Sequence, residues 1–241
     1  MFEIPEATRQ SRGQSIKTLL SISNNEEITA VVSFKGFKEE KYLFMATSKG
    51  IVKKVSISDF SNAKTRGIMA INLDKGDKLE SAMLTRGKDD ILLITRRGQA
   101  LRFHEETVRA TGRSSRGVIG IRLGKNDELT GVALVDNKGS MLLISQYGFG
   151  KRIAYDNFIP HGRGTRGQTC YGISEKTGEV IGALSVKRGD SLVCITSQGK
   201  TIRLRLNEIP VLGKTAMGVR LVRISRPVMV MGIARIAKTK A

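Results

Sequence analysis

The sequence contains no tryptophan, only two cysteines and two histidines, and about half as many acidic as basic residues. Two histidines and two isolated cysteines do not supply the ligand cluster of a zinc site, so no metal or other cofactor is expected. No run of roughly 18 apolar residues is present, so no membrane-spanning helix is expected. Aromatic residues make up only 5%, which leaves few stacking platforms for single-stranded nucleic acid.

Both cysteines, Cys170 and Cys194, lie within or beside apolar runs. We therefore expect buried free thiols in a reducing compartment rather than a disulfide.

Basic residues dominate the charge of the chain. Lys and Arg number 41 against 22 Asp and Glu, a net charge of +19. Such an excess predicts a polyanionic partner, either nucleic acid or an anionic membrane surface. The hydrophobic content of 40% is ordinary for a folded protein and argues against disorder.

Two markers recur along the chain with a period of about 50 residues, which predicts a repeat architecture. The first marker is Arg-Gly, found at 12–13, 66–67, 116–117 and 166–167, with Met217-Gly218 as a degraded fifth copy. The second is a glycine that follows a short apolar run, at Gly50, Gly98, Gly148 and Gly199.

Each repeat reads as four short strands. In the second repeat we expect strands at 68–73, 79–84, 91–95 and 100–103, with a hairpin turn at 96–98. The equivalents of the third strand are 42–47, 141–145 and 192–196. A β-sandwich would also have regularly spaced short strands, but not five matched copies. The prediction is an all-β, propeller-like array of four-stranded repeats.

We expect residues 1–241 to form one domain of about five partial or complete blades. Residues 1–12 resemble the connector that follows a fourth strand elsewhere, so the chain is expected to begin in mid-repeat with the first blade missing.

The charge is periodic as well. The segments 48–67, 96–117, 146–167 and 197–218 hold 19 of the basic residues and five acidic ones. Four residues after each hairpin glycine stands Lys54, Arg102, Arg152 or Arg203. An even offset keeps side chains on one face of a strand, so we expect these four to point alike and to form part of a basic belt.

A belt of this kind suits the phosphates of duplex DNA, because displaced counterions give affinity without sequence readout. The candidate DNA-binding residues are Arg9, Arg12, Lys49, Lys53, Lys54, Lys64, Arg66, Arg96, Arg97, Arg102, Arg109, Arg113, Arg116, Lys151, Arg152, Arg163, Arg166, Lys200, Arg203 and Lys214.

Two patterns resemble nucleotide-binding motifs. Residues 162–167 match GxGxxG, but a connector precedes them and a strand-like run follows, where a dinucleotide site needs a strand and a helix. Residues 213–215 resemble the end of a P-loop but lack its first glycine. We therefore expect no catalytic residue in this chain.

Several stretches together resemble the C-terminal domain of the DNA gyrase A protein, one of the two gyrase polypeptides. They are residues 3–7 (Glu-Ile-Pro-Glu-Ala) with 11–13, residues 95–98 with 101–102, and residues 112–118. The resemblance spans nearly the whole chain. It implies a β-pinwheel, a propeller variant with swapped strand connections, which wraps duplex DNA around its basic perimeter.

The resemblance also implies a role and a setting. A domain of this kind is non-catalytic and supports ATP-dependent supercoiling by a bacterial type II topoisomerase. Its partners would be duplex DNA, the breakage-reunion part of the gyrase A protein, and the ATPase polypeptide of the heterotetramer, with no membrane involved. The location would be cytoplasmic and nucleoid-associated.

The sequence departs from the family pattern in one respect. The signature Gln-Arg-Arg-Gly-Gly-like box of the first blade is absent, so the resemblance is to a member truncated at its N-terminus. The related polypeptide of topoisomerase IV also lacks an intact box, but residues 3–7 favour gyrase. The alternative from another functional class is a β-propeller scaffold that binds an acidic protein partner.

Overall fold

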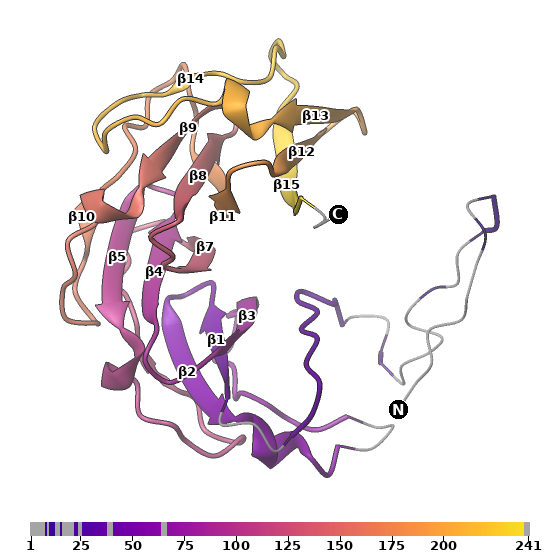
Figure 1. Ribbon diagram of the computed structural model, residues 1–241, viewed down its shortest axis with the longest axis vertical. Helices are drawn as coiled ribbons and strands as arrows, with labels where there is room; N and C mark the ends of the chain where they lie inside the picture. The colour runs from indigo at the N-terminus through magenta and orange to yellow at the C-terminus, as the bar shows by residue number, and fades with distance from the viewer. Residues whose placement is uncertain are drawn as a thin grey trace.

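The computed structural model describes residues 8, 10–12, 15, 22–23, 26–37, 41–63 and 67–238. Four antiparallel sheets follow one another in an arc around a central hub (Figure 1). The helices are single 3-10 turns, η1 (Ile57–Phe60), η2 (Glu105–Thr107), η3 (Tyr155–Asn157) and η4 (Leu206–Glu208). In the described part of the chain, no helix has the length and apolar character needed to cross a membrane.

Each sheet, which we call a blade and number from 1 to 4 along the chain, is built around one β-hairpin. The hairpins are β1 (Tyr42–Thr47) with β2 (Ile51–Ser56), β4 (Asp90–Thr95) with β5 (Gln99–His104), β8 (Gly139–Ser145) with β9 (Phe149–Ala154), and β12 (Ser191–Thr196) with β13 (Thr201–Arg205). The predicted hairpin strands are confirmed to within two residues.

The first strand of each hairpin occupies the middle of its blade. On its inner side it pairs with β3 (Leu79–Thr85), β7 (Leu129–Leu134), β11 (Val180–Lys187) or β15 (Val230–Ile236). These inner strands lie around the hub and contact one another from blade to blade (Figure 1). Leu92 and Leu93, on opposite faces of β4, are both fully buried, as predicted for a strand covered on both faces.

Three very short strands complete the outer edges of blades 1 to 3. They are β6 (Val118–Ile119), β10 (Gln168–Thr169) and β14 (Val219–Arg220), which pair with β2, β5 and β9. Each follows the hairpin of one blade but joins the sheet of the blade before it, giving the order β3-β1-β2-β6 in blade 1. This exchange is the swapped connection of a β-pinwheel.

Glycines of both markers lie where a swapped strand packs closely against the hairpin of the preceding blade. Gly98 has φ 72°, and a Cβ placed there would lie 2.5 Å from the carbonyl oxygen of Tyr171, just beyond β10. Gly167 has φ 77°, and its Cβ would lie 2.4 Å from the carbonyl oxygen of Ala100. Both positions therefore require glycine for backbone conformation and for close approach. A Cβ placed at Gly67 or Gly199 would have nothing within 4 Å, so these two share only the positive φ, and the backbone conformation is what the described markers have in common.

The core is divided among the blade boundaries. One apolar cluster joins Phe44 of blade 1 to Leu93 of blade 2, a second joins Leu92 to Met141 of blade 3, and a third joins blade 3 to Leu192 of blade 4. Neighbouring blades therefore stabilise one another, as expected of a repeat protein.

One predicted strand is wrong. Residues 68–73 have no strand pairing, although their counterparts β6, β10 and β14 do. Those counterparts pair with the hairpin of the preceding blade, and within the described residues no hairpin precedes β1. The described residues contain four sheets, and the expectation of about five partial or complete blades stays a prediction.

Candidate nucleic-acid interface

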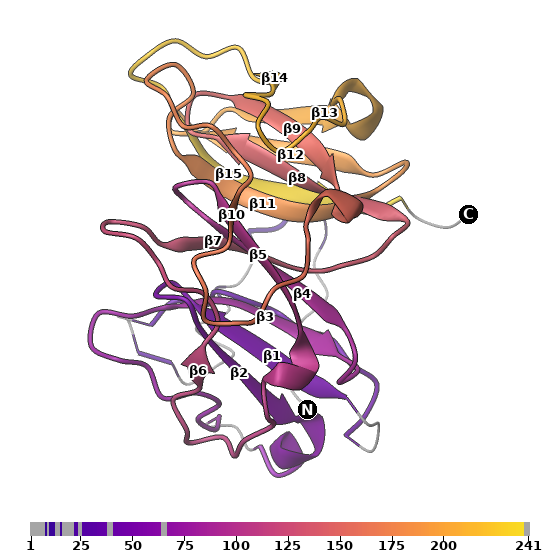
Figure 2. The same ribbon diagram turned by 90° about the vertical axis from the view of Figure 1, so that its left-hand side faces the viewer.

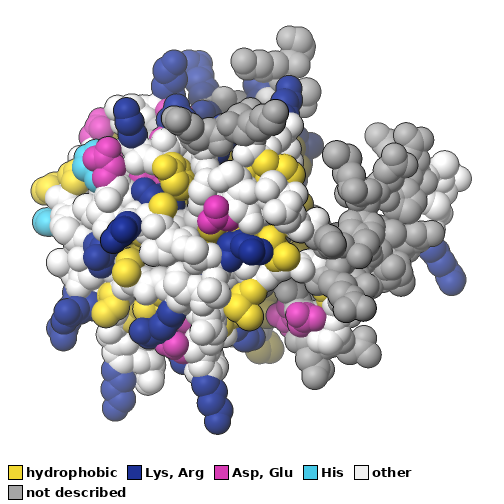
Figure 3. Space-filling model, turned by 90° about the horizontal axis from the view of Figure 1, so that it is seen from below, with side chains coloured by type: hydrophobic (Ala, Val, Ile, Leu, Met, Phe, Trp, Pro, Cys, Tyr) yellow, Lys and Arg dark blue, Asp and Glu magenta, His cyan; other side chains and the backbone are white. Residues whose placement is uncertain are grey.

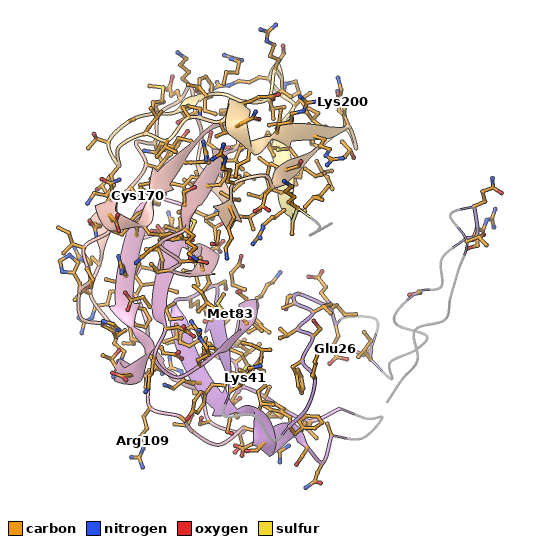
Figure 4. All side chains as sticks on the ribbon, viewed as in Figure 1. Glu26, Lys41, Met83, Arg109, Cys170 and Lys200 are labelled. Atoms are coloured by element: carbon orange, nitrogen blue, oxygen red, sulfur yellow. The ribbon has the colours of Figure 1, made fainter. Side chains whose placement is uncertain are left out.

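The outer rim of the arc consists of the swapped strands and the connectors that lead to them. Because the inner strands occupy the opposite edge of each sheet, the described connectors of the predicted basic segments lie on this rim. Figure 2, in which the rim faces the viewer, shows β6, β10 and β14 with their connectors along it. The side chain of Arg109, in the connector of blade 2, points away from the ribbon (Figure 4).

Two lysines predicted for the belt are buried instead. Lys53 is 1% exposed and Lys151 is fully buried. Lys53 Nζ donates to the carbonyl oxygens of Ala70, Arg113 and Ser115, at 2.8, 2.5 and 2.8 Å. Burial lowers the pKa of Lys53. The prediction that these two side chains lie on the surface is wrong.

Three of the four bases at the shared strand phase also face protein. Lys54 Nζ donates to the carbonyl of Glu105 at 3.0 Å, and Arg102 NH1 donates to that of Tyr155 at 3.2 Å. Arg152 Nε donates to the carbonyl of Ile209 at 2.7 Å, and burial lowers the pKa of Arg152.

In each case the acceptor lies in or directly after the 3-10 turn of the next blade. We call Lys54, Arg102 and Arg152 the latch residues. They do point alike, as predicted, but toward the neighbouring connector rather than toward solvent. Arg203, at the same phase in blade 4, is exposed and donates to Ser191 Oγ at 3.2 Å.

Several exposed arginines form ion pairs. Arg96 lies 2.9 Å from a carboxylate oxygen of Glu128 and 3.2 Å from one of Glu179. Arg116 pairs with Asp74 at 2.5 Å. Hydrogen bonds to these carboxylates raise the pKa of both arginines, which stay charged but are partly neutralised.

Two bases of the 162–167 and 213–218 loops are half-buried. Arg163 donates to the carbonyls of Thr107 at 2.9 Å and Ile119 at 3.2 Å, so it ties the loop to blade 1 and blade 2. Lys214 donates to the side-chain oxygen of Gln168. Lys49 is exposed, and its ammonium donates to the carbonyl of Lys75 at 2.8 Å.

The remaining candidate DNA-binding residues fall into two groups, those that the structure describes and those that lie outside the described residues. Arg12, Arg97, Arg109, Arg166 and Lys200 are exposed, and Arg113 is half-buried. Arg9, Lys64 and Arg66 lie outside the described residues.

Four cations converge on a hollow of about 580 Å³ beside the hairpin turn of blade 2, which we call the blade 2 hollow. Arg97 comes from the turn, Arg122 and Lys125 from the loop between β6 and β7, and Arg166 from the connector before β10. Asp127 also lines it, but its carboxylate is mostly buried and accepts the backbone N–H of Arg97 at 2.9 Å. Arg97 Nε lies 3.5 Å from a carboxylate oxygen of Glu179. Among the described residues, Arg122, Lys125 and Arg166 form no ion pair with an acidic side chain.

A hollow of about 270 Å³, which we call the blade 3 hollow, occupies the corresponding place in blade 3. Arg220 lies 4.9 Å from the ring centre of Phe149, and Lys176 lies 5.5 Å from it. Arg226 lies 4.4 Å from the ring centre of Tyr147. An aromatic ring holds a cation in place without cancelling its charge, unlike a carboxylate.

The sequence-based selection missed five of these bases, Arg122, Lys125, Lys176, Arg220 and Arg226. It considered segments that end at the Arg-Gly glycine, and these bases stand after that glycine. A weak indication was present, since Arg122 and Arg223 both follow a marker glycine by five residues and both are exposed. Seen from below, Lys and Arg project at several points of the edge, with fewer Asp and Glu among them (Figure 3).

Comparison with known proteins agrees with this architecture. The family model described as "DNA gyrase C-terminal domain, beta-propeller" matches residues 2–35, 41–86, 89–136, 140–187 and 190–237. A solved C-terminal domain of DNA topoisomerase IV superposes with a TM-score of 0.87 at 22% identity, over 93% of this chain and 70% of that one. A solved DNA gyrase A C-terminal domain superposes with a TM-score of 0.82 at 24% identity, over 95% and 76%. At these identities the two structures show the fold.

Curated relatives are more similar in sequence. The DNA gyrase A protein of Treponema pallidum (strain Nichols) is 58% identical over 97% of this chain, and that of Clostridium acetobutylicum is 44% identical over 98%. The chain spans 29% of the length of each of these relatives. With five matched segments that together cover most of its length, the chain belongs to the family of DNA gyrase C-terminal domains.

Proposed function

We propose that this chain binds duplex DNA along its outer rim and wraps it around the arc of blades. The observation that carries the proposal is the blade 2 hollow, where Arg97, Arg122, Lys125 and Arg166 converge from three separate segments. A phosphate placed there would meet three positive charges that no acidic side chain of the described residues neutralises, those of Arg122, Lys125 and Arg166, whereas Arg97 is shared with Glu179. Each contact would release condensed counterions.

The curvature of the rim favours bent DNA. Bending a site of 20–30 bp costs roughly 1–6 kcal/mol, which phosphate contacts must offset. The blade 3 hollow adds Arg220 and Arg226 one blade further along the arc. Successive hollows on a curved rim would therefore hold successive stretches of a bent duplex, and longer DNA should bind more tightly until the arc is filled.

We further propose that the domain acts without catalysis, within a longer enzyme. The curated relatives named above are DNA gyrase A proteins, and this chain corresponds to 29% of their length. Wrapping by this domain would present a DNA segment to the breakage-reunion part of that protein, and the ATPase polypeptide would drive supercoiling. A plasmid assay with the ATPase polypeptide and ATP tests this role. The breakage-reunion part alone should only relax the plasmid, whereas its fusion to this chain should also supercoil it.

A salt titration of duplex binding tests the proposed DNA binding. The logarithm of the affinity should fall linearly with the logarithm of salt concentration, by about 0.9 per phosphate neutralised. Two duplexes of equal length and unrelated sequence should bind alike. A flat salt response would instead support the acidic-protein scaffold, and strong preference for one sequence would contradict backbone recognition.

A further inference from the structure

The buried ammonium groups of Lys53 and Lys151 each organise a loop on the rim. Lys151 Nζ donates to the carbonyl oxygens of Gly213, Lys214 and Ala216, at 2.9, 2.6 and 2.6 Å. An ammonium has three N–H donors, so these three acceptors satisfy it completely. The loop 213–218 is folded with these three carbonyl groups turned inward around one buried positive charge.

The geometry of the peptide unit fixes where the amides of that loop point. In a trans peptide, the carbonyl of one residue and the N–H of the next lie in one plane and point in opposite directions. The N–H groups of Lys214, Thr215 and Met217 therefore point away from the ammonium. Thr215 and Met217 are exposed, and none of the three amides donates to another residue that the structure describes.

Loop 112–117 repeats this arrangement around Lys53. The carbonyls of Arg113 and Ser115 bind the ammonium, so the N–H groups of Ser114 and Arg116 point away from it. These two amides also donate to no other residue in the described ranges. Both loops close with the same turn, from Ser115 N to Gly112 O and from Ala216 N to Gly213 O, each at 3.3 Å.

We propose that loops 112–117 and 213–218 are phosphate-binding sites, in which outward backbone amides bind oxygens of a DNA phosphate in front of a buried lysine. The inference rests on the proposed DNA binding. It assigns part of that binding to backbone N–H groups, which a search for exposed charged side chains would not reveal. Concave arrays of backbone N–H groups bind anions. The lysine behind them adds a positive charge and orients the peptide dipoles outward.

The buried lysine and the marker arginine occur together in loop 112–117, which has Lys53 and Arg116, but not in the other repeats that the structure describes. Loop 213–218 has lost the arginine of the Arg-Gly marker to Met217, yet it keeps the outward amides and Lys151. In blade 2 the position equivalent to Lys151 is Leu101, and the corresponding loop carries Arg166 on its surface. Loop 162–167 thus offers positive charge on an exposed arginine side chain, whereas loop 213–218 offers backbone N–H groups in front of a buried lysine.

A matched pair of variants at Lys214 tests the proposal. Lys214→Ala removes the side chain and keeps the amide, whereas Lys214→Pro removes both. Proline suits this position, because Lys214 is the second residue of the turn that begins at Gly213. Affinity for duplex DNA should be about tenfold lower for Lys214→Pro than for Lys214→Ala, as the loss of one hydrogen bond to a charged group implies. The salt slopes of the two should agree, because both carry the same charge.

Amide resonances give a second readout on the unaltered protein. Adding duplex DNA should shift the amide protons of Thr215 and Met217 downfield, and Lys151→Met should abolish these shifts. Equal affinities of the two Lys214 variants, or DNA binding without these shifts, would overturn this inference and leave the proposed function standing. Failure of the unaltered chain to bind duplex DNA would overturn both.

Discussion

The guanidinium of Arg102 lies against the carboxylate of Asp90, whose Oδ2 is 2.6 Å from NH2 and 2.9 Å from Nε. The same guanidinium donates from NH1 to the carbonyls of Tyr155 and Phe158 in the next blade, at 3.2 and 3.3 Å. Its side chain is 16% exposed. Arg102 therefore joins two blades, and its charge is already engaged by protein.

Arg102→Ala should act on stability more than on DNA binding. The substitution leaves the carboxylate of Asp90 and two carbonyls without their donor, so the free energy of unfolding should fall by roughly 3 kcal/mol, as for other broken buried pairs. Urea unfolding measures this. The exposed Arg109→Ala is the control and should change stability by less than about 0.5 kcal/mol. If Arg102→Ala weakened DNA binding and left the urea midpoint unchanged, Arg102 would belong to the DNA-binding belt, as the sequence analysis predicted.

Leu93→Ala should separate folding from binding. Leu93 is fully buried between blades 1 and 2, and the cavity left by its truncation should lower the free energy of unfolding by roughly 2–5 kcal/mol. At a temperature where the variant is still folded, its affinity and salt slope for duplex DNA should match those of the unaltered protein. A lower affinity under those conditions would place this part of the core in the binding function.

Among single substitutions on the rim, those at residues of the blade 2 hollow should have the largest effect on the salt dependence of DNA binding. Arg166→Ala should weaken duplex binding equally for all sequences and reduce the salt slope by about one. Lys138 is also an exposed base, in the turn between β7 and β8 away from the rim, so Lys138→Ala should leave the slope unchanged. Equal effects of the two variants would mean that net charge alone, rather than this hollow, attracts DNA.

The sequence predicted the hairpins and the inner strands because each is local and repeats with its marker glycine. Strand 68–73 failed for a different reason, since a swapped strand forms only where the preceding blade supplies a partner. The swap itself pairs Val118 with Val52, 66 positions earlier in the numbering, and nothing in the local composition indicates such a partner. It was implied only by the family resemblance.

The candidate site was harder to predict than the fold. The alternation of side chains along a strand correctly placed Lys54, Arg102 and Arg152 on the same face of their strands. It does not indicate whether that face contacts solvent or a neighbouring connector. Their acceptors are backbone carbonyls, which leave no trace in the sequence. For the same reason Lys151 looked like any other base of the belt, although its ammonium is enclosed by the loop 213–218.

Both thiols should be unreactive in the folded protein. Burial raises the pKa of Cys170 to about 12 and that of Cys194 to about 11, so at pH 8 little thiolate is available in either case. A thiol-specific reagent should label neither cysteine in native buffer and both in denaturant. Rapid labelling of one site without denaturant would indicate local opening of the core around it.

Lys151 should make stability depend on pH in an unusual direction. Burial lowers its pKa from 10.5 to about 8 in the folded protein, whereas the unfolded chain keeps the ordinary value. Between about pH 8 and 10.5 the unfolded chain therefore holds a proton that the folded chain has lost, and the free energy of unfolding should rise with pH across this window.

The comparison with Lys151→Met isolates this effect, because all other titrating groups are common to both proteins. The difference in free energy of unfolding, unaltered minus variant, should grow by up to about 1.4 kcal/mol per unit of pKa shift. Over the same window the ammonium becomes an amine with only two N–H donors for three carbonyls, so the turn that holds the Ala216 amide should loosen. The exchange rate of that amide should rise with pH more steeply than its intrinsic rate, while global stability increases. A flat difference would mean that the three carbonyl groups stabilise the charged form enough to offset its burial, and that the loop keeps its shape at high pH.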